Sequence, residues 1–223
     1  MPIQNSPTRL AVFSDFDGTV SAQDVGNRLF HYFSNGRSEE PVRQWQEGII
    51  DSRQCLLAEA ELMRDVTERE LRDFIDTFSI DETFAAFVDL MRRKAIPLYI
   101  LSDGLDLYID QLLAREGLTG LPVLANKARI EQGRLKLSFP YLDNSCGDCA
   151  NCKGYHIRRL RPPGGRAIYI GDGKSDLCSL PEADIVFAKG YLAEYCQSHH
   201  IEYLPFGNFS AISSVMTRNI LPV

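Results

Sequence analysis

Short apolar runs that end in polar turns recur along the chain. They occupy residues 10–13, 97–101, 167–170 and 185–188, and a further strand is expected near Tyr203. Runs of this length and composition predict strands buried inside a sheet. Helical patterns separate them. The alternation of strand, turn and helix indicates a mostly parallel, doubly wound α/β sheet.

A long helical stretch separates the first two of these strands. From about residue 22 to residue 94, apolar side chains recur at helical spacing, and Thr67 with Glu70 predicts a capping box. This stretch is too long for a simple crossover. We therefore expect a core domain of residues 1–21 and 95–223, with a helical cap domain of residues 22–94 lying over the strand ends.

Further elements follow the second strand. The apolar spacing after Gly104 predicts a helix that ends near Gly117, a residue suited to a helix C-terminus. Residues 128–139 alternate around Gln132 and Gly133, which predicts a β-hairpin. A cysteine-rich loop comes next, and a helix is expected from about residue 154.

Composition limits the function classes. The 223 residues are 44% hydrophobic and 24% charged, as in ordinary globular proteins. Lys and Arg total 24 against 30 Asp and Glu, and this net charge of −6 argues against binding to nucleic acid. No apolar run approaches the roughly 20 residues of a membrane span, and no signal peptide is recognisable. We expect a cytoplasmic protein with mostly reduced cysteines and no membrane partner.

Acidic residues stand at the ends of two predicted strands. Asp15 and Asp17 alternate around Phe16, so both carboxylates should lean into the same crevice while the ring enters the core. Asp172 and Asp176 follow the third strand. Carboxylates this close repel one another unless a cation joins them. Mg²⁺ suits a few carboxylates completed by water and phosphate, so it is the predicted cofactor.

The middle turn supplies groups that favour an anion. Ser102, Asp103 and Gly104 precede a predicted helix, and backbone N–H groups at a helix N-terminus bind anions. Lys153 follows the cysteine-rich loop and would add a positive charge. A metal, an anion cradle and two carboxylates together fit phosphoryl transfer.

The order of these motifs resembles the haloacid dehalogenase superfamily. The sequence DFDGT, then Ser102, then Lys153, then GDGxxD extends the resemblance over about residues 10–209. The helical insertion after the first strand is similar to the cap of the phosphoserine-phosphatase-like branch. The resemblance implies a Rossmann-like core with a C1-type cap, and a Mg²⁺-dependent phosphatase.

The resemblance also implies a role for each matched residue. Asp15 would attack phosphorus, and Asp17 would protonate the leaving oxygen and then activate water. The acid at position 17 favours a phosphatase, because ATPase pumps of the family carry Thr there and dehalogenases lack it. The implied phosphate-binding residues are Ser102, Asp103, Gly104 and Lys153. The implied metal-binding residues are Asp15, Asp17 through its carbonyl, Asp172 and Asp176, the last binding the ion or orienting its ligands.

The resemblance implies a small phosphorylated metabolite as substrate, and several classes stay open. A cysteine-rich loop leading into the motif Lys resembles the methionine-salvage phosphatases that act on 2-hydroxy-3-keto-5-methylthiopentenyl-1-phosphate, and also the phosphoethanolamine/phosphocholine phosphatases. The former is our first choice. A phosphoserine phosphatase is a third alternative, for which Arg43, Glu47 and Arg53 are cap candidates by composition alone. A phosphotransferase and a catalytically silent phosphate-binding protein remain competing hypotheses.

The cysteine-rich loop itself has three interpretations. Cys146, Cys149 and Cys152 have the spacing of metal ligands, but a structural zinc site needs four. Cys178 or a histidine would have to complete the set from elsewhere in the chain. Without it, the loop is structural with reduced thiols, or it forms a disulfide under oxidation.

Overall fold

One sheet organises the molecule. The computed structural model describes residues 9–144 and 146–221, and within them seven strands form a sheet in the order β4-β3-β2-β1-β5-β6-β7. Neighbouring strands are parallel except β3 and β4. The strands are β1 (Leu10–Ser14), β2 (Leu98–Leu105), β3 (Val123–Glu131), β4 (Arg134–Ser138), β5 (Arg166–Gly171), β6 (Ile185–Ala188) and β7 (Leu204–Pro205). The predicted α/β class is confirmed.

Helices connect these strands. The α-helices are α1 (Val25–Phe33), α2 (Glu39–Gln46), α3 (Ser52–Leu62), α4 (Glu68–Ile75), α5 (Phe84–Arg93), α6 (Asp106–Arg115), α7 (Lys153–Leu160), α8 (Gly190–Ser198) and α9 (Phe209–Asn219). The 3₁₀ segments are η1 (Leu142–Asn144) and η2 (Lys174–Glu182). The predicted capping box at Thr67 and Glu70 opens α4. In the described part of the chain, no helix has the length and apolar character needed to span a membrane.

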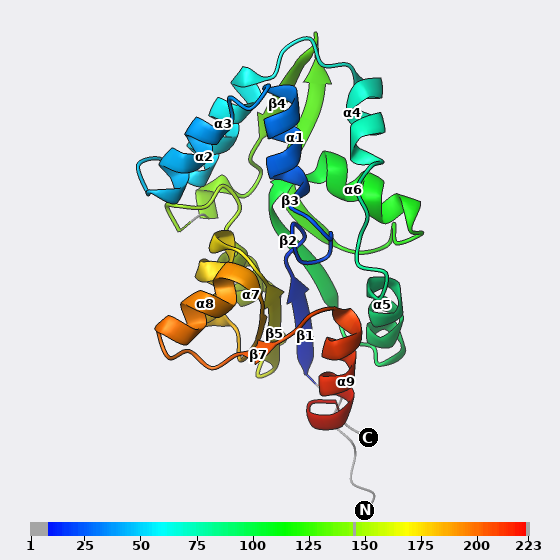
Figure 1. The fold of residues 1–223 in the computed structure, drawn as a ribbon. Helices are drawn as coiled ribbons and strands as arrows, with labels where there is room; N and C mark the ends of the chain where they lie inside the picture. Colours follow the sequence, from blue (N-terminus) through cyan, green and yellow to red (C-terminus); the bar gives the residue numbers. More distant parts are fainter. Residues whose placement is uncertain (1–8, 145, 222–223) are drawn as a thin grey trace, which may run out of the picture.

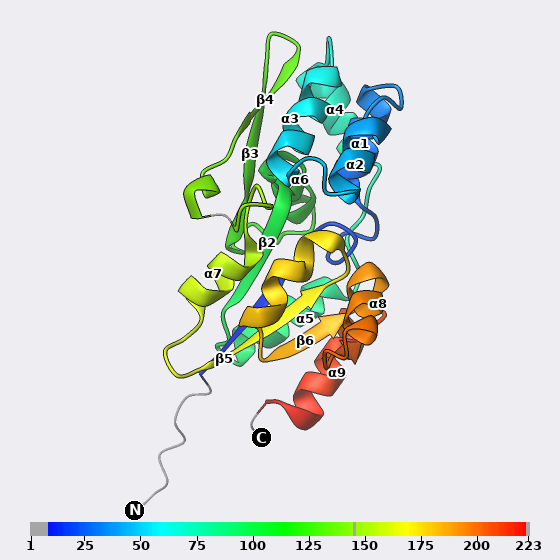
Figure 2. The ribbon, with the colours of Figure 1, turned by 90° about the vertical axis from the view of Figure 1, so that its left-hand side faces the viewer.

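Helices cover both faces of the sheet, so its central strand is buried throughout. Leu10 and Val12 of β1 belong to the core beneath α5, α6 and α9, whereas Ala11 and Phe13 belong to the core beneath α7 and α8 (Figures 1 and 2). Successive side chains of a strand point to opposite faces. This explains why β1 is a continuous apolar run rather than an alternating one.

The helical insertion after β1 divides into two parts in space. Helices α1 to α4 gather beyond the carboxyl ends of the central strands, beside the projecting β3–β4 hairpin (Figures 1 and 2). Helix α5 instead packs next to α9 on the sheet, where the rings of Phe84 and Phe209 lie 4.7 Å apart. We propose that the cap consists of α1 to α4 and that α5 belongs to the core, which would shorten the predicted cap of residues 22–94.

Two elements differ from the expectations of the sequence. The predicted hairpin exists, but β3 begins earlier, at Val123, and its first residues pair in parallel with β2 before the strand turns to β4. The first half is held in the sheet because Leu124 and Ala125 are buried. Helix α9 was not predicted, although Phe209, Ile212 and Met216 recur at helical spacing and Asn208 caps its first turn.

The sheet topology fixes the place of a ligand site. The chain runs from β1 through β2 to β3 on one side and returns through β5 and β6 on the other. Strand β1 therefore lies at the point where the order reverses. In open α/β sheets, ligands bind beyond the carboxyl ends of the strands at such a point. The predicted turns after β1, β2 and β5 meet there.

Candidate active site

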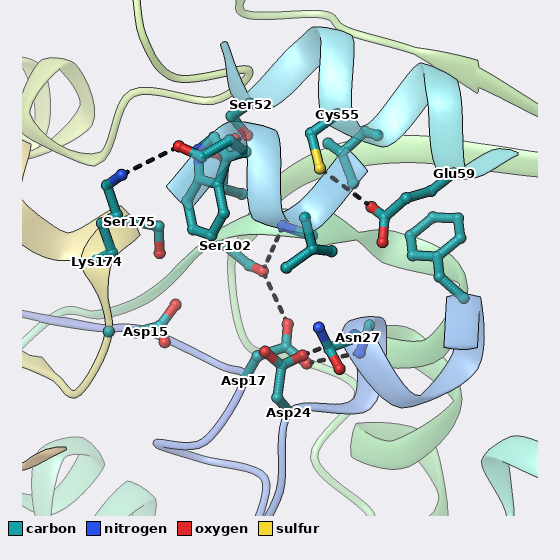
Figure 3. Close-up of a pocket in the computed structure, with 18 of the residues that line it drawn as sticks. Asp15, Asp17, Asp24, Asn27, Ser52, Cys55, Glu59, Ser102, Lys174 and Ser175 are labelled. Carbon is teal, nitrogen blue, oxygen red and sulfur yellow. Dashed lines mark hydrogen bonds between the residues drawn. The ribbon is translucent and has the colours of Figure 1, made fainter. Parts of the chain in front are cut away.

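A cavity of about 590 Å³ separates the carboxyl ends of the strands from the cap helices (Figure 3). Its core side carries the polar residues of the predicted motifs, namely Asp15, Asp17, Ser102, Asp103, Gly104, Asp172 and Ser175. Its cap side is mixed, with apolar Phe30, Val42, Trp45, Cys55 and Leu56 beside polar Asp24, Asn27, Gln46, Ser52 and Glu59. The cavity thus joins a charged floor to a cap side that is apolar in part.

Lys153 is a buried cation beside two carboxylates. Its Nζ donates to Asp15 Oδ1 at 2.5 Å, to Ser175 Oγ at 3.0 Å, and to Asp176 Oδ1. Its side chain is 1% exposed. Burial disfavours its charge, but Asp15 and Asp176 outweigh that penalty and raise the pKa of Lys153 well above its usual value. The lysine is therefore charged wherever these carboxylates are ionised.

Asp176 is saturated with hydrogen bonds. Its Oδ1 accepts from Lys153 and from the hydroxyl of Tyr169, and its Oδ2 accepts from the backbone N–H groups of Asp172 and Gly173, each at 2.8 Å. A carboxylate offers about four acceptor positions, and these four donors use them. We infer that Asp176 holds Lys153 and the Asp172 turn in place, the orienting role rather than the ligating one.

The turn after β1 is shaped around Asp172. The hydroxyl of Thr19 donates to Asp172 Oδ1 at 2.7 Å. Gly18 has a φ of +72°, and a Cβ atom there would lie 2.4 Å from Asp172 Oδ2. Any side chain at Gly18 would displace that carboxylate. Gly18 and Thr19 of the DFDGT motif therefore hold the carboxylate of Asp172 in its position.

Asp17 faces the cap rather than the other carboxylates. Its Oδ1 accepts from the N–H groups of Val25 and Gly26, at 2.9 Å and 3.2 Å, and its Oδ2 accepts from the Tyr108 hydroxyl at 2.5 Å. Burial raises the pKa of Asp17 to about 7, and the nearby carboxylate of Asp24 adds to the rise. The group therefore holds and releases a proton close to neutral pH.

Ser102 belongs to a distorted end of β2. Its Oγ accepts from the N–H of Gly104 at 2.9 Å and lies 3.5 Å from Asp17 Oδ2. A Cβ at Gly104 would lie 1.8 Å from the Tyr108 hydroxyl, so this position requires glycine. The helix expected after this turn is α6, which has Leu105 as its N-cap residue and begins at Asp106. The structure adds that residues 102–104 belong to β2, which has a bulge between Leu101 and Leu105.

The carboxylate of Asp103 connects three segments. It accepts from the Ser52 hydroxyl of α3 at 2.5 Å and from the backbone N–H of Asn151 at 2.6 Å. The side chain of Asn151 in turn donates to the carbonyl of Ser102 at 2.8 Å. Burial raises the pKa of Asp103 to about 6. This carboxylate joins the cap to the loop before Lys153. Because its oxygen atoms are used in these contacts, only the backbone of Asp103 is suited to contact a phosphate.

The acidic residues fit a hard divalent cation. Asp15, Asp172 and Asp176 offer oxygen atoms that lie within 4.8 Å of one another. Burial and the adjacent carboxylates, Asp176 foremost, raise the pKa of Asp15 well above its usual value. A cation bound among these oxygens would relieve their repulsion. Carboxylate oxygen is the ligand type of Mg²⁺, and the side chain of Asp17 lies outside this group.

Glu59 is an acid inside the apolar part of the cavity. Its side chain is 4% exposed, and its Oε2 lies 3.7 Å from the Cys55 sulfur (Figure 3). Burial raises the pKa of Glu59 to about 8, with a further contribution from the Asp24 carboxylate. The carboxyl group is therefore protonated at neutral pH. It is therefore a hydrogen-bond donor that lines the cavity.

This protonation predicts a pH-dependent stability. Between pH 4.5, the ordinary pKa, and about 8, folded Glu59 keeps a proton that the unfolded chain releases. Stability therefore falls as pH rises through this window. We expect Glu59→Gln to remove this contribution. The free energy of unfolding of the variant, relative to that of the wild type, should therefore rise by about 4 kcal/mol between pH 5 and pH 8. Denaturant unfolding at a series of pH values measures the difference.

The control for this experiment lies on the same helix. Glu61 is exposed, so Glu61→Gln should leave the pH dependence of wild type unchanged. Parallel pH profiles for wild type and Glu59→Gln would contradict a buried, protonated Glu59.

The cap residues expected from composition do not line the cavity. Arg43 forms exposed ion pairs with Glu40 and Glu47, each at 2.7 Å, on the surface of α2. Arg53 lies over the Phe139 ring, 5.6 Å from its centroid. Neither arginine, nor Glu47, is among the residues around the cavity. A head-group clamp made from these three residues is therefore wrong.

Three residues of the site escaped the sequence analysis. Tyr108 and Asp24 surround Asp17, and Glu59 stands in the cavity. Tyr108 follows Gly104 by four residues and lies in the first turn of α6. This spacing could have indicated that its side chain lies near the strand ends. Glu59 lies among buried positions on α3, where an acidic residue is unusual.

The predicted cysteine-rich loop lies on the outer side of Lys153. Cys146, Cys149 and Cys152 bring their sulfur atoms within 4.8 Å of one another. Cys146 and Cys149 border a second, smaller hollow that also touches Ser175 and Cys178, and none of these cysteines lines the main cavity. These cysteines are therefore placed to support the site rather than to contact a substrate.

Comparison with known proteins agrees with this geometry. A family model described as haloacid dehalogenase-like hydrolase matches residues 12–181. A 2-hydroxy-3-keto-5-methylthiopentenyl-1-phosphate phosphatase of Lysinibacillus sphaericus is 31% identical over 209 residues, covering 89% of this chain and 90% of the relative.

Solved structures with the same fold also match. A haloacid dehalogenase family hydrolase from Salmonella enterica serovar Typhi gives a TM-score of 0.73 at 18% identity, covering 98% of this chain and 74% of that one. A phosphoserine phosphatase from T. onnurineus gives a TM-score of 0.68 at 16% identity, covering 97% of this chain and 98% of that one. At these identities the likeness concerns the fold. It agrees with the cap inserted after β1.

Proposed function

Because the chain belongs to the haloacid dehalogenase-like hydrolase family, we propose that it hydrolyses a phosphate monoester through an aspartyl-phosphate on Asp15. The observation that carries this proposal is the pairing of buried Asp15 with Lys153 at the floor of a cavity. Lys153 binds only one oxygen of Asp15. Among the described residues no group donates to the other oxygen, which leaves it for attack on phosphorus.

The first step transfers the phosphoryl group to the protein. An oxygen of Asp15 forms a bond to phosphorus, and the bond from phosphorus to the ester oxygen breaks. The leaving oxygen takes its proton from Asp17, which stands on the cap side of the same turn. Lys153 and the Ser102 hydroxyl balance charge on the transferring oxygens.

The second step returns the phosphoryl group to water. Asp17, now ionised, removes a proton from a water molecule whose oxygen attacks phosphorus. The bond from phosphorus to Asp15 breaks, and inorganic phosphate leaves. Asp17 ends the cycle protonated, as it began. The N–H groups of Val25 and Gly26 keep its carboxylate in position for both steps.

Mg²⁺ is the cofactor that we propose for this site. Asp15, Asp172 and the backbone carbonyl of Asp17 would hold the ion, and Asp176 would orient the surrounding groups. When bound, Mg²⁺ neutralises phosphate charge and draws Asp15 and the phosphate together. Thr19 and the absence of a side chain at Gly18 fix the ligand Asp172 for this purpose.

We propose 2-hydroxy-3-keto-5-methylthiopentenyl-1-phosphate as the substrate. The relative from Lysinibacillus carries this substrate in its name. The cap side of the cavity supports the assignment, because Phe30, Val42 and Leu56 offer an apolar surface for a methylthio group. Protonated Glu59 would donate a hydrogen bond to an oxygen of the carbon chain.

A cationic substrate such as phosphocholine or phosphoethanolamine is the second candidate. The specific observation in its favour is that an acid, Glu59, and an aromatic ring, Trp45, both line the cavity. A cation beside Glu59 would require that carboxyl to ionise. Its raised pKa opposes this at neutral pH, so the neutral substrate is preferred.

A substrate panel tests both the proposed reaction and the proposed substrate. Phosphate release would be measured with and without Mg²⁺ for the enol-phosphate, phosphocholine, phosphoethanolamine and phosphoserine. We expect Mg²⁺-dependent release, with kcat/KM at least about tenfold higher for the enol-phosphate than for the others. A preference for phosphocholine would overturn the substrate but keep the chemistry. No release from any substrate by metal-loaded, folded protein would overturn the phosphatase and favour a binding protein.

A further inference from the structure

We infer that Cys146, Cys149, Cys152 and Cys178 form a tetrathiolate site for a structural zinc ion. The loop before α7 supplies three of these cysteines, and η2, which packs against α7, supplies the fourth. This is the fourth ligand that the loop sequence lacks. The site is separate from the acidic centre proposed for Mg²⁺ and does not depend on the proposed substrate.

The distances between sulfur atoms suit one tetrahedral ion. Cys149 Sγ lies 3.4 Å from Cys146 Sγ and 3.7 Å from Cys178 Sγ. The sulfur atoms of Cys146, Cys149 and Cys152 all lie within 4.8 Å of one another. A tetrahedral zinc ion with Zn–S bonds of about 2.3 Å holds its sulfur ligands about 3.8 Å apart. The three loop sulfurs are therefore gathered near this spacing, and Cys178 reaches them through its contact with Cys149.

The backbone at Gly154 supports the same conclusion. A Cβ there would lie 2.2 Å from the Cys178 carbonyl oxygen, so glycine at this position permits the close approach of the two segments that carry Cys152 and Cys178.

A soft divalent metal explains the cluster better than a disulfide does. A disulfide joins two sulfurs at about 2.05 Å and would leave two others beside it without a purpose. Thiolate ligands select zinc over Mg²⁺, which prefers oxygen. Cys146 is exposed and Cys152 is buried, so a bound ion would lie at the outer side of the cluster. A metal ion from solvent could enter the site there.

The position of the cluster gives the ion a structural role. Cys152 directly precedes Lys153, and Cys178 follows Asp176 by two residues. The ion would therefore clamp together the two segments whose side chains meet in the buried Lys153–Asp176 pair. The loop also reaches the third segment of the site, because Asn151 binds the Ser102 carbonyl.

Metal analysis tests the inference without reference to turnover. Protein produced with zinc present and purified under reducing conditions should carry about one zinc ion per chain. Cys149→Ala and Cys178→Ala should each carry less than about a tenth of this amount. Cys196→Ala is the matched control, since that thiol is buried in α8 away from the cluster, and it should keep the zinc.

A second measurement covers variants that fail to fold. Cobalt replacing zinc in the wild-type protein should give the thiolate-to-cobalt charge-transfer bands and strong visible bands of a tetrahedral sulfur site. Wild-type protein with no zinc and four reactive thiols in the cluster would overturn the inference. So would a disulfide among these cysteines in freshly isolated protein, or a zinc content unchanged in both cluster variants.

Discussion

Replacement of Asp15 by Asn is expected to lower kcat by at least about 10³-fold, because the amide oxygen is a poor nucleophile towards phosphorus. The fold should survive. Asp15, Asp172 and Asp176 crowd around one lysine, and burial with mutual repulsion raises the pKa of Asp15. Removing one of these charges relieves repulsion, so the free energy of unfolding should not fall. Steady-state kinetics and denaturant unfolding of the same preparations measure both effects.

The control for Asp15→Asn is the same change at an exposed acid. Asp89 on α5 lies at the surface, beside Arg92, so Asp89→Asn should keep full activity. Activity of Asp15→Asn within tenfold of wild type would contradict the nucleophile assignment. Loss of both activity and stability would instead indicate a structural role for the Asp15 carboxylate.

Replacement of Lys153 by Met should be the most destabilising change in the site. The methionine fills a similar volume but leaves Asp15 and Asp176 buried without their cation. Breaking a buried ion pair from one side costs about 3–5 kcal/mol of folding free energy. Turnover should also fall by at least about 10²-fold, because no cation then faces the phosphoryl oxygens. Lys136→Met, on the exposed face of β4, is the control.

A double variant separates charge from shape in this prediction. When Lys153→Met is combined with Asp15→Asn, one fewer buried carboxylate is left without a cation. The double variant should therefore be more stable than Lys153→Met alone. Urea unfolding of wild type, both single variants and the double variant gives the coupling between the two side chains. Additive changes in the free energy of unfolding would contradict the buried ion pair as the source of the effect.

Much of the core could be predicted because its signals are local. The run of residues 10–13 is apolar on both faces, which marks a central strand, and the structure has it at the centre of the sheet. Carboxylates at the ends of β1 and β5 meet because both strands are parallel neighbours. The order of Asp15, Ser102, Lys153 and Asp172 along the chain was enough to predict one crevice.

The remainder depends on contacts between distant segments. Nothing near Asp17 in the sequence shows that Tyr108 donates to it, because α6 reaches that carboxylate only after the sheet has formed. The fourth cysteine likewise joins its loop through the packing of η2 on α7. Arg43 and Glu47, which were candidates by composition alone, pair with each other on the surface of α2, as charged cap residues often do.

Detection of the phosphorylated protein tests the central claim most directly. Wild-type protein would be mixed with Mg²⁺ and the enol-phosphate, quenched in acid within milliseconds, and digested for mass spectrometry. We expect one added phosphoryl group on the peptide that contains Asp15, absent from Asp15→Asn and absent without substrate. Steady phosphate release by the wild type with no phosphorylated peptide at any quench time, or with the group on another residue, would contradict the account.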